Sequence, residues 1–435
     1  MVFLIITVVL VPTVWFANRI FKSWINPLSI FAIEWYFLVF LYHLKLINYP
    51  DLSFTTWYVI IISFLAFLLG CITVFIARLL NPKTIDVEQK SNEELTALSN
   101  PRLYLYLTIV FGIIGLLGAF QAWTVLIHMY GSVTKALLNL GALYHMRVHS
   151  GEVKGIMPYV STFSYVAVFT AGIYSAYKSR ITFISALPLI AIVLKEIAMV
   201  GRAGILFGFL EFALTFLFAK KLLFKSSNKR NYKLIFSIIF TIVLFVVSIT
   251  AVKNLRGTTD SFSGKTKSIK ALDQGSFISS SIYLYASGHL GVLNGFLYHE
   301  KEPVRWGENT FLFAYNFLNK FNIVDKPIAY PRGYYVPMWI NTGTFMKELI
   351  ADFGIGGELL FLYLLGLFIS LFWYKSLERK NIFSFIFLIY LSLIIALSFL
   401  SIATRLTVWI FSLSFLIIVF SIIKQFKNRT LSYGK

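Results

Sequence analysis

The stretch from Tyr330 to Tyr374, YPRGYYVPMWINTGTFMKELIADFGIGGELLFLYLLGLFISLFWY, joins a polar, charge-bearing loop to a long apolar run. Glu348 and Asp352 lie in its middle part, and their spacing of four places both on one face of a helix. A Gly-rich break at 354–357 is followed by an apolar run of about 20 residues, which is the length that crosses a bilayer. The stretch therefore predicts a polar segment held against a membrane span.

The composition of the whole chain is typical of a membrane protein. Of its 435 residues, 58% are hydrophobic and 13% are charged, whereas a soluble domain is roughly one-quarter charged. The net charge of +20 fits Lys and Arg in cytoplasmic loops, and no basic cluster on a soluble segment indicates a nucleic-acid partner. The single cysteine, Cys71, lies in an apolar run, which excludes a disulfide framework and a thiolate metal site. We therefore expect an all-α integral membrane protein.

Apolar runs long enough to cross a bilayer predict about eleven transmembrane helices in a single polytopic domain, residues 1–435. Loops rich in Lys and Arg alternate along the chain with loops that are poorer in these residues. Because basic loops usually lie on the cytoplasmic side, this pattern predicts an external amino terminus and a cytoplasmic carboxyl terminus. The first run has no basic region before it and no cleavage site, so we interpret it as a retained span. The expected spans lie near 1–18, 25–46, 56–79, 103–128, 157–177, 182–200, 203–219, 234–252, 355–374, 382–400 and 407–423.

This orientation places two longer loops outside the cytoplasm, a smaller one at 130–158 and a large one at 253–345. Within the large loop we expect short helices, and 276–298 combines small, aromatic and apolar residues. Three glycines recur in this segment: Gly288, Gly291 and Gly295. We expect a helix that lies in or dips into the membrane interface and packs closely on its neighbours, and not a twelfth span.

Ionisable residues at membrane depth are often functional, because a charge in lipid is costly. Pairing with charges on other helices is the alternative explanation for several of them. The residues concerned are Glu34, Lys195, Glu196, Arg202, Glu211, Glu358 and Arg405.

Arginines at the outer membrane boundary indicate an anionic ligand. Basic residues usually accumulate in cytoplasmic loops, so outer loops are expected to contain few arginines. A guanidinium group can bind two phosphate oxygens at once. A helix that begins near Asn341, Thr342 or Thr344 would add backbone N–H groups to such a site, although these residues can also serve only as a cap. Contact with lipid headgroups is the alternative for the arginines. The candidates are Arg202, Arg256, Arg332 and Arg405.

A proton acceptor is available in Glu348, Asp352 or His289, in that order of preference. Pairing of the two carboxylates with Lys347 or with the arginines is the alternative. The aromatic loop from Tyr330 to residue 339 presents flat apolar faces that suit stacking on sugars. The sequence has no P-loop, no HExxH and no Rossmann glycine pattern, and no acidic cluster in an outer loop, so we expect neither a cofactor nor a metal.

Four segments resemble the Wzy-type repeat-unit polymerases of bacterial O-antigen and capsule assembly. NTGTFMKELIADFGIGGELLFLYLLGLF resembles their late loop-and-span motif, and VGRAGILFGFLEF resembles their mid-chain Gly-Arg span. SIYLYASGHLGVLNGFLYHE, followed by WGENTFLFAYNFLNKF, resembles the segment that precedes the late motif. Arg202 matches the Gly-Arg motif, Arg256 has the position after a span, and Arg147 corresponds by its location in the earlier loop.

The resemblance implies a metal-independent membrane glycosyltransferase with the GT-C-like polymerase and ligase fold. It would lie in the bacterial cytoplasmic (inner) membrane, with its active site facing the periplasm or the cell exterior. The growing glycan would move from undecaprenyl pyrophosphate onto a new lipid-linked repeat unit, and arginines of the outer loops would hold the pyrophosphate. A flippase and a chain-length regulator would be partners, in addition to membrane lipid and the undecaprenyl-pyrophosphate-linked oligosaccharide.

Three other functions stay open. An O-antigen ligase would use similar chemistry with the lipid A core of lipopolysaccharide as its acceptor. A lipid-linked oligosaccharide flippase or other transporter would have short loops on both faces, which the long outer segment 253–345 disfavours. A structural membrane component without catalysis is the third.

Overall fold

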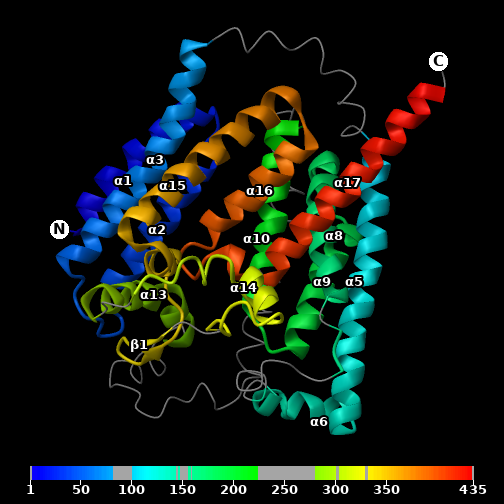
Figure 1. The fold of residues 1–435 in the computed structure, drawn as a ribbon, viewed down its shortest axis with the longest axis horizontal. Coiled ribbons are helices and arrows are strands. Elements are labelled where there is room, and N and C mark those ends of the chain that lie inside the picture. Colours follow the sequence, from blue (N-terminus) through cyan, green and yellow to red (C-terminus); the bar gives the residue numbers. More distant parts are fainter. Residues whose placement is uncertain are drawn as a thin grey trace. The chain divides into compact units, whose positions relative to one another are not determined.

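The computed structural model describes residues 2–81, 100–143, 146, 155–157, 159–223, 280–299, 303–328 and 332–433. These residues are mostly helical, as the sequence predicts (Figure 1). The strands in the described part of the chain form a two-stranded antiparallel hairpin, with β1 (Tyr334–Tyr335) paired to β2 (Trp339–Ile340).

Each expected span except 234–252, which lies outside the described residues, contains a helix. The helices are α1 (Val2–Phe21), α2 (Pro27–His43), α3 (Phe54–Leu80), α5 (Pro101–Tyr130), α8 (Phe163–Lys178), α9 (Phe183–Ala198), α10 (Ala203–Phe218), α15 (Phe345–Arg379), α16 (Ile382–Ala396) and α17 (Thr407–Tyr433).

Within the described residues, five helical stretches are long and apolar enough to cross a membrane. They are Phe54–Leu80, Pro101–Tyr130, Ala203–Leu222, Phe345–Arg379 and Thr407–Phe426, while α2 and α16 are apolar but shorter. The full number of about eleven spans stays a prediction.

Polar residues directly before the apolar runs start several helices. Asn26 accepts a hydrogen bond from the Ser29 backbone N–H at 2.9 Å, and Pro27 fills the first helical position of α2. Ser53 caps α3 in the same way through the Thr56 backbone N–H, at 3.2 Å. These local interactions explain why the helix ends are readable from the sequence.

The chain packs into two compact units, each assembled from parts that are distant in sequence. Unit 1 comprises Met1–Asp86, Phe262–Tyr374 and Leu391–Trp409. Unit 2 comprises Val87–Ser261, Lys375–Tyr390 and Ile410–Lys435. Neither unit is a continuous stretch of chain, so long-range packing defines both of them.

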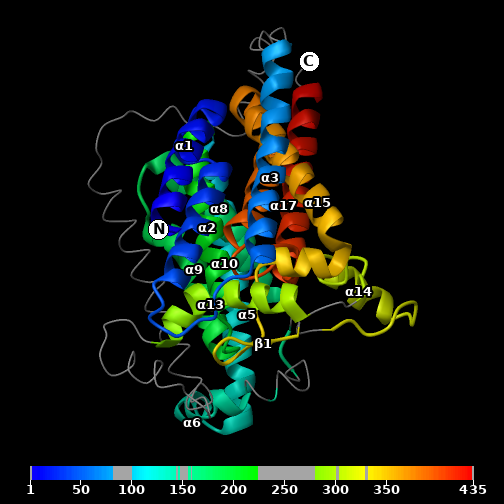
Figure 2. The ribbon, with the colours of Figure 1, turned by 90° about the vertical axis from the view of Figure 1, so that its left-hand side faces the viewer.

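In unit 1, α13 (Ser280–His299) runs crosswise to α2 and α3 (Figure 2). The expected helix in the large outer loop is therefore present, and it is not among the stretches that could cross a membrane. The Gly-rich break in α15 is a kink at Gly354, whose φ of 69° and ψ of 176° are not helical. It turns the short first part of α15, residues 345–353, away from the long apolar part that follows.

The β1–β2 hairpin lies on the glycine-bearing side of α13. A side-chain Cβ at any of these glycines would lie 2.1–3.0 Å from a hairpin side-chain atom, so a larger residue would force the hairpin side chains to move. The close pairs are Gly288 with Ile340, Gly291 with Val336, and Gly295 with Tyr334. The expectation that these glycines pack closely on a neighbour is thus confirmed.

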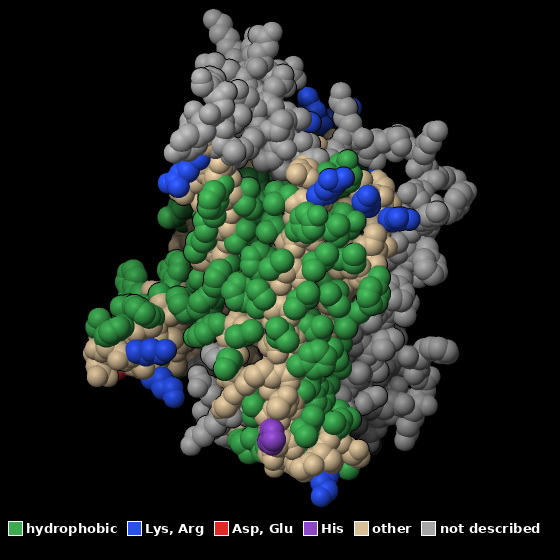
Figure 3. Space-filling view, turned by 90° about the vertical axis from the view of Figure 1, so that its right-hand side faces the viewer, with side chains coloured by type: hydrophobic (Ala, Val, Ile, Leu, Met, Phe, Trp, Pro, Cys, Tyr) green, Lys and Arg blue, Asp and Glu red, His purple; other side chains and the backbone are tan. Residues whose placement is uncertain are grey.

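In unit 2, α5 packs on α8 and α9, and aromatic contacts join α17 to the same bundle. The rings of Phe163 and Phe415 lie 4.7 Å apart, and those of Tyr104 and Phe420 lie 6.2 Å apart. Hydrophobic side chains cover the outward face of α5 and α17 (Figure 3). An exposed apolar face of this length on long apolar helices suits contact with lipid.

Candidate functional site

The first part of α15 carries Glu348 and Asp352 into the interior of unit 1, where both side chains are buried. Two other segments meet them there: the loop at 303–311 and the segment from Ser398 to Arg405, which ends in the 3₁₀ turn Ala403–Arg405. We refer to Glu348, Asp352, Asn309, Thr310 and Arg405 as the carboxylate–arginine cluster.

Asp352 accepts four hydrogen bonds from two consecutive residues. Its Oδ1 accepts from the backbone N–H of Asn309 at 3.0 Å and from Nδ2 at 2.8 Å. Its Oδ2 accepts from the backbone N–H and the hydroxyl of Thr310, both at 2.7 Å. With both oxygens engaged in this way, Asp352 fixes the loop.

Glu348 and Arg405 form a buried ion pair, with Oε1 and Nη1 3.3 Å apart. The other carboxylate oxygen of Glu348 accepts the Ile402 backbone N–H at 2.6 Å. Arg405 also donates from Nη1 to Asn309 Oδ1 at 2.5 Å and from Nη2 to the Ile328 carbonyl at 3.0 Å. The predicted residues Glu348 and Arg405 are thus brought together, and Arg405 links Glu348 to the loop that Asp352 holds.

Lys347, next to Glu348 on α15, also contacts the hairpin. Its Nζ donates to the Arg332 carbonyl at 2.6 Å and lies 5.1 Å from the centre of the Tyr334 ring. Lys347 therefore connects α15 to the hairpin, and Arg332 lies exposed at the entrance to β1.

His289, on α13, is buried and has a defined tautomer. Its Nδ1 lies 3.1 Å from the Thr342 carbonyl, which can only accept, so Nδ1 carries the proton and Nε2 is the basic atom. Nε2 is buried and has no hydrogen-bond partner among the described residues. Burial lowers the pKa of His289 below its usual range, so the ring is neutral near pH 7. This arrangement can accept a proton.

The start of α15 differs from the expected helix cap. Thr344 directly precedes the helix, but its hydroxyl is buried and has no hydrogen-bond partner in the part of the chain that the structure describes. The Phe345 backbone N–H donates instead to the Ser398 carbonyl at 2.9 Å. Asn341 is exposed, and Thr342 uses its carbonyl to orient His289. The first backbone N–H of this helix is therefore bonded within the protein, and anion binding at the helix end stays a prediction.

Glu34, on α2, holds the same segment from its other end. Its Oε1 accepts the Ser398 hydroxyl and the Phe399 backbone N–H, each at 3.0 Å. The Trp35 indole N–H donates to the Ser398 hydroxyl at 2.8 Å. Carboxylates on α2 and α15 thus fix the connection between α16 and α17, and this segment carries Arg405.

Four of these polar partners are not among the residues that the sequence predicts for the site. They are Asn309, Thr310, Ser398 and Thr404, the last of which donates its hydroxyl to the Thr310 carbonyl at 2.7 Å. Small polar residues that interrupt apolar runs are the only signal they leave in the sequence, and such residues also occur in ordinary turns.

In unit 2, the Gly-Arg motif accommodates a carboxylate. A Cβ at Gly201 or Gly204 would lie 1.9 or 2.1 Å from an oxygen of Glu196, so both glycines leave room for this side chain. Glu196 pairs with Lys195 at 2.5 Å and accepts from the Tyr165 hydroxyl at 3.3 Å. Arg202 directly precedes α10 and is partly exposed.

Two other glutamates that the sequence predicts at membrane depth have hydroxyl partners. Glu211 accepts from the Tyr390 hydroxyl at 2.7 Å in unit 2, and Glu358 accepts from the Ser63 hydroxyl at 2.6 Å in unit 1. Three predicted site residues, Arg147, Arg256 and Tyr330, lie outside the described residues.

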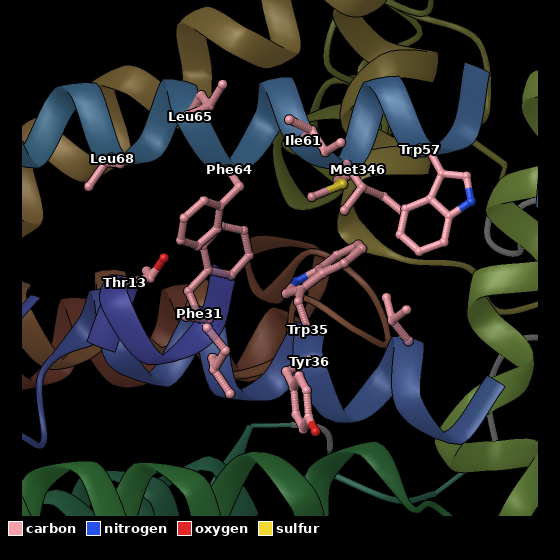
Figure 4. Close-up of a pocket in the computed structure, with 14 residues that line it drawn as sticks. Thr13, Phe31, Trp35, Tyr36, Trp57, Ile61, Phe64, Leu65, Leu68 and Met346 are labelled. Atoms are coloured by element: carbon pink, nitrogen blue, oxygen red, sulfur yellow. The ribbon is translucent and has the colours of Figure 1, made fainter. Parts of the chain in front are cut away.

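An apolar cavity of about 470 Å³ lies between α1, α2 and α3 in unit 1 (Figure 4). Phe31, Trp35 and Tyr36 line it from α2, while Trp57 and Phe64 face them from α3. Met346, at the start of α15, also lines the cavity. Trp35 and Met346 therefore border both the cavity and the segments that carry the cluster.

No protein-family model, no curated protein and no solved structure matches this chain.

Proposed function

We propose that this protein is a Wzy-type polymerase, a metal-independent glycosyltransferase that elongates a glycan on undecaprenyl pyrophosphate. The observation that carries the proposal is the buried Glu348–Arg405 pair at the start of α15, a helix that is long and apolar enough to cross a membrane. The resemblance of residues 281–321 and 341–368 to these polymerases supports the same activity. The proposed location is the bacterial inner membrane, with the cluster on the external side.

In the proposed reaction, an acceptor hydroxyl of the new repeat unit attacks the anomeric carbon of the donor glycan. The bond from that carbon to the pyrophosphate oxygen breaks, and undecaprenyl pyrophosphate leaves with the electron pair. Arg405 stabilises the charge that develops on the leaving group. The hydroxyl proton passes to Glu348, which lies against Arg405, or to His289, whose Nε2 is basic; Asp352 positions the loop.

Substrate binding is proposed for the other residues that the sequence predicts. Arg202, Arg256, Arg332 and Arg147 are proposed to bind phosphate and glycan, together with Asn341, Thr342 and Tyr330. Tyr335 and Trp339 are exposed and lie opposite each other on β1 and β2, which suits stacking on a sugar. The aromatic cavity between α2 and α3 is proposed to hold part of the polyprenyl chain, because its lining is apolar.

The test is a reaction in detergent or nanodiscs with purified protein, undecaprenyl-pyrophosphate repeat units and a chelator. A ladder of glycans on a gel is the expected product. Arg405→Lys keeps the charge but loses the planar fork, so we expect a rate lower by about 100-fold, or about 3 kcal/mol of transition-state stabilisation. Arg102→Lys changes an exposed arginine at the start of α5 and serves as the control with an unchanged ladder.

Thermal unfolding of each variant separates lost catalysis from lost folding. A normal ladder from folded Arg405→Lys protein would remove Arg405 from the mechanism. Transfer that occurs only after lipid A core is added would assign the protein as a ligase, and the absence of any transfer by folded protein would favour a flippase.

A further inference from the structure

Residues 308–328 form a projection from unit 1 that contains α14 (Leu312–Asn319; Figure 2). No residue of α14 is buried, although this helix is mostly apolar. Large side chains near it are also open to the surroundings: Trp306 is 79% exposed, Phe321 62% and Ile323 66%. Aromatic residues in a helix usually bury one face, so these exposed side chains suit a further partner surface.

The projection is nevertheless folded and is held by hydrogen bonds at its neck, by which we mean its two ends at residues 308–309 and 328. The Ile328 backbone N–H donates to Glu308 Oε1 at 2.5 Å, which closes the loop. Arg405 donates to Asn309 Oδ1 on one side of the neck and to the Ile328 carbonyl on the other. Internal contacts include a hydrogen bond from Asn319 Nδ2 to the Val324 carbonyl at 2.9 Å. The exposed aromatic face is therefore a property of an ordered element.

Apolar and basic side chains lie on different sides of the projection. Hydrophobic side chains gather on one side of it and Lys or Arg side chains on the other (Figure 3). The exposed phenylalanines of the projection include Phe311, Phe317 and Phe321, and its exposed lysines are Lys320 and Lys326. This segregation is typical of helices that lie in the plane of a membrane surface.

The position of the neck favours lipid as the partner. Asp352, in the first part of α15, holds Asn309, and the continuation of α15 is long and apolar enough to cross a bilayer. The projection therefore lies a short distance from the end of a candidate span, where aromatic residues commonly sit at headgroup depth. Its lysines match the negative charge of anionic headgroups.

We propose that the projection docks onto the bilayer that holds the protein, with its phenylalanines in the acyl boundary and its lysines at anionic headgroups. Because Arg405 holds both sides of the neck, this docking sets the depth of Arg405 and Glu348 relative to the lipid surface. The proposal depends on the membrane location of the chain and is independent of the reaction that it catalyses.

Fluorescence quenching of single-cysteine variants tests this docking. In a Cys71→Ala background, Phe317→Cys and Phe321→Cys report the apolar side, and the matched variants Lys320→Cys and Lys326→Cys report the basic side. Each is labelled with bimane and placed in nanodiscs of phosphatidylcholine and phosphatidylglycerol, with or without bromine on the acyl chains. Iodide serves as the aqueous quencher.

We expect bromolipid to quench positions 317 and 321 at least about twofold more than positions 320 and 326, and iodide to show the opposite order. Equal access of iodide to all four positions, without quenching by bromolipid, would show that the projection lies in water and would overturn the proposal. Protection of positions 317 and 321 from both quenchers, with energy transfer between labelled copies, would also overturn it and identify a second protein copy as the partner.

Discussion

Asp352→Asn tests whether one buried carboxylate holds the loop that carries α14. In the wild-type chain, four donors from Asn309 and Thr310 point at the two carboxylate oxygens. An asparagine keeps one oxygen and replaces the other with an NH₂ group, which places donors against donors. A buried donor without an acceptor costs about 1–3 kcal/mol. With partial relaxation, we therefore expect the free energy of opening the loop to fall by about 3 kcal/mol.

Hydrogen exchange measures this loss at the site itself. A free-energy change of 1.4 kcal/mol is a factor of ten, so the backbone amides of Asn309 and Thr310 should exchange about 100-fold faster in the variant. Mass spectrometry of peptides that cover 303–312 provides the measurement. Asp325→Asn, at an exposed aspartate of the same projection, is the matched control and should leave exchange unchanged. Equal exchange in the two variants would refute the assigned role of Asp352.

Two further predictions concern α13. Gly291→Leu places a Cβ 2.1 Å from Val336, so we expect the free energy of unfolding to fall by about 1–3 kcal/mol or more and the thermal midpoint to fall with it. The control Gly356→Ala has no atom within 4 Å of the new Cβ and should not lower the midpoint. Equal midpoints for the two variants would contradict the close hairpin contact. His289 has a lowered pKa in the folded state, so the unfolded chain binds the extra proton and stability decreases as pH falls below about 6.5. His289→Gln should weaken this acid dependence, measured as the difference in thermal midpoint between about pH 7.5 and about pH 5; an unchanged difference would count against burial of a neutral His289.

The helices of this chain follow from the sequence because their causes are local. Runs such as 54–80 and 101–130 are long and apolar enough to cross a membrane, and in lipid every backbone group of such a run must bond within the helix. Gly354 marked the break in α15, since few other residues adopt a positive φ without strain. The glycines of α13 likewise predicted a close neighbour, although the identity of that neighbour was not readable.

The surroundings of the candidate residues were decided by tertiary structure. Glu348 and Asp352 were expected on one face of a helix, and both are buried on α15. Their partners are far away in sequence: Glu348 meets Ile402 across 54 residues, and Asp352 meets Asn309 across 43. Periodicity cannot report contacts of this kind, because a single asparagine or serine between apolar runs has the same local pattern in any turn.

The sequence by itself therefore determined the all-α class, the positions of the helices and the residues able to carry charge at their ends. Only the tertiary structure decided that Asp352 holds a loop, that Glu348 pairs with Arg405, and that His289 keeps a basic nitrogen. The physical reason is that apolar burial depends on local composition and length, whereas the role of a buried polar group depends on which donors and acceptors the fold brings to it.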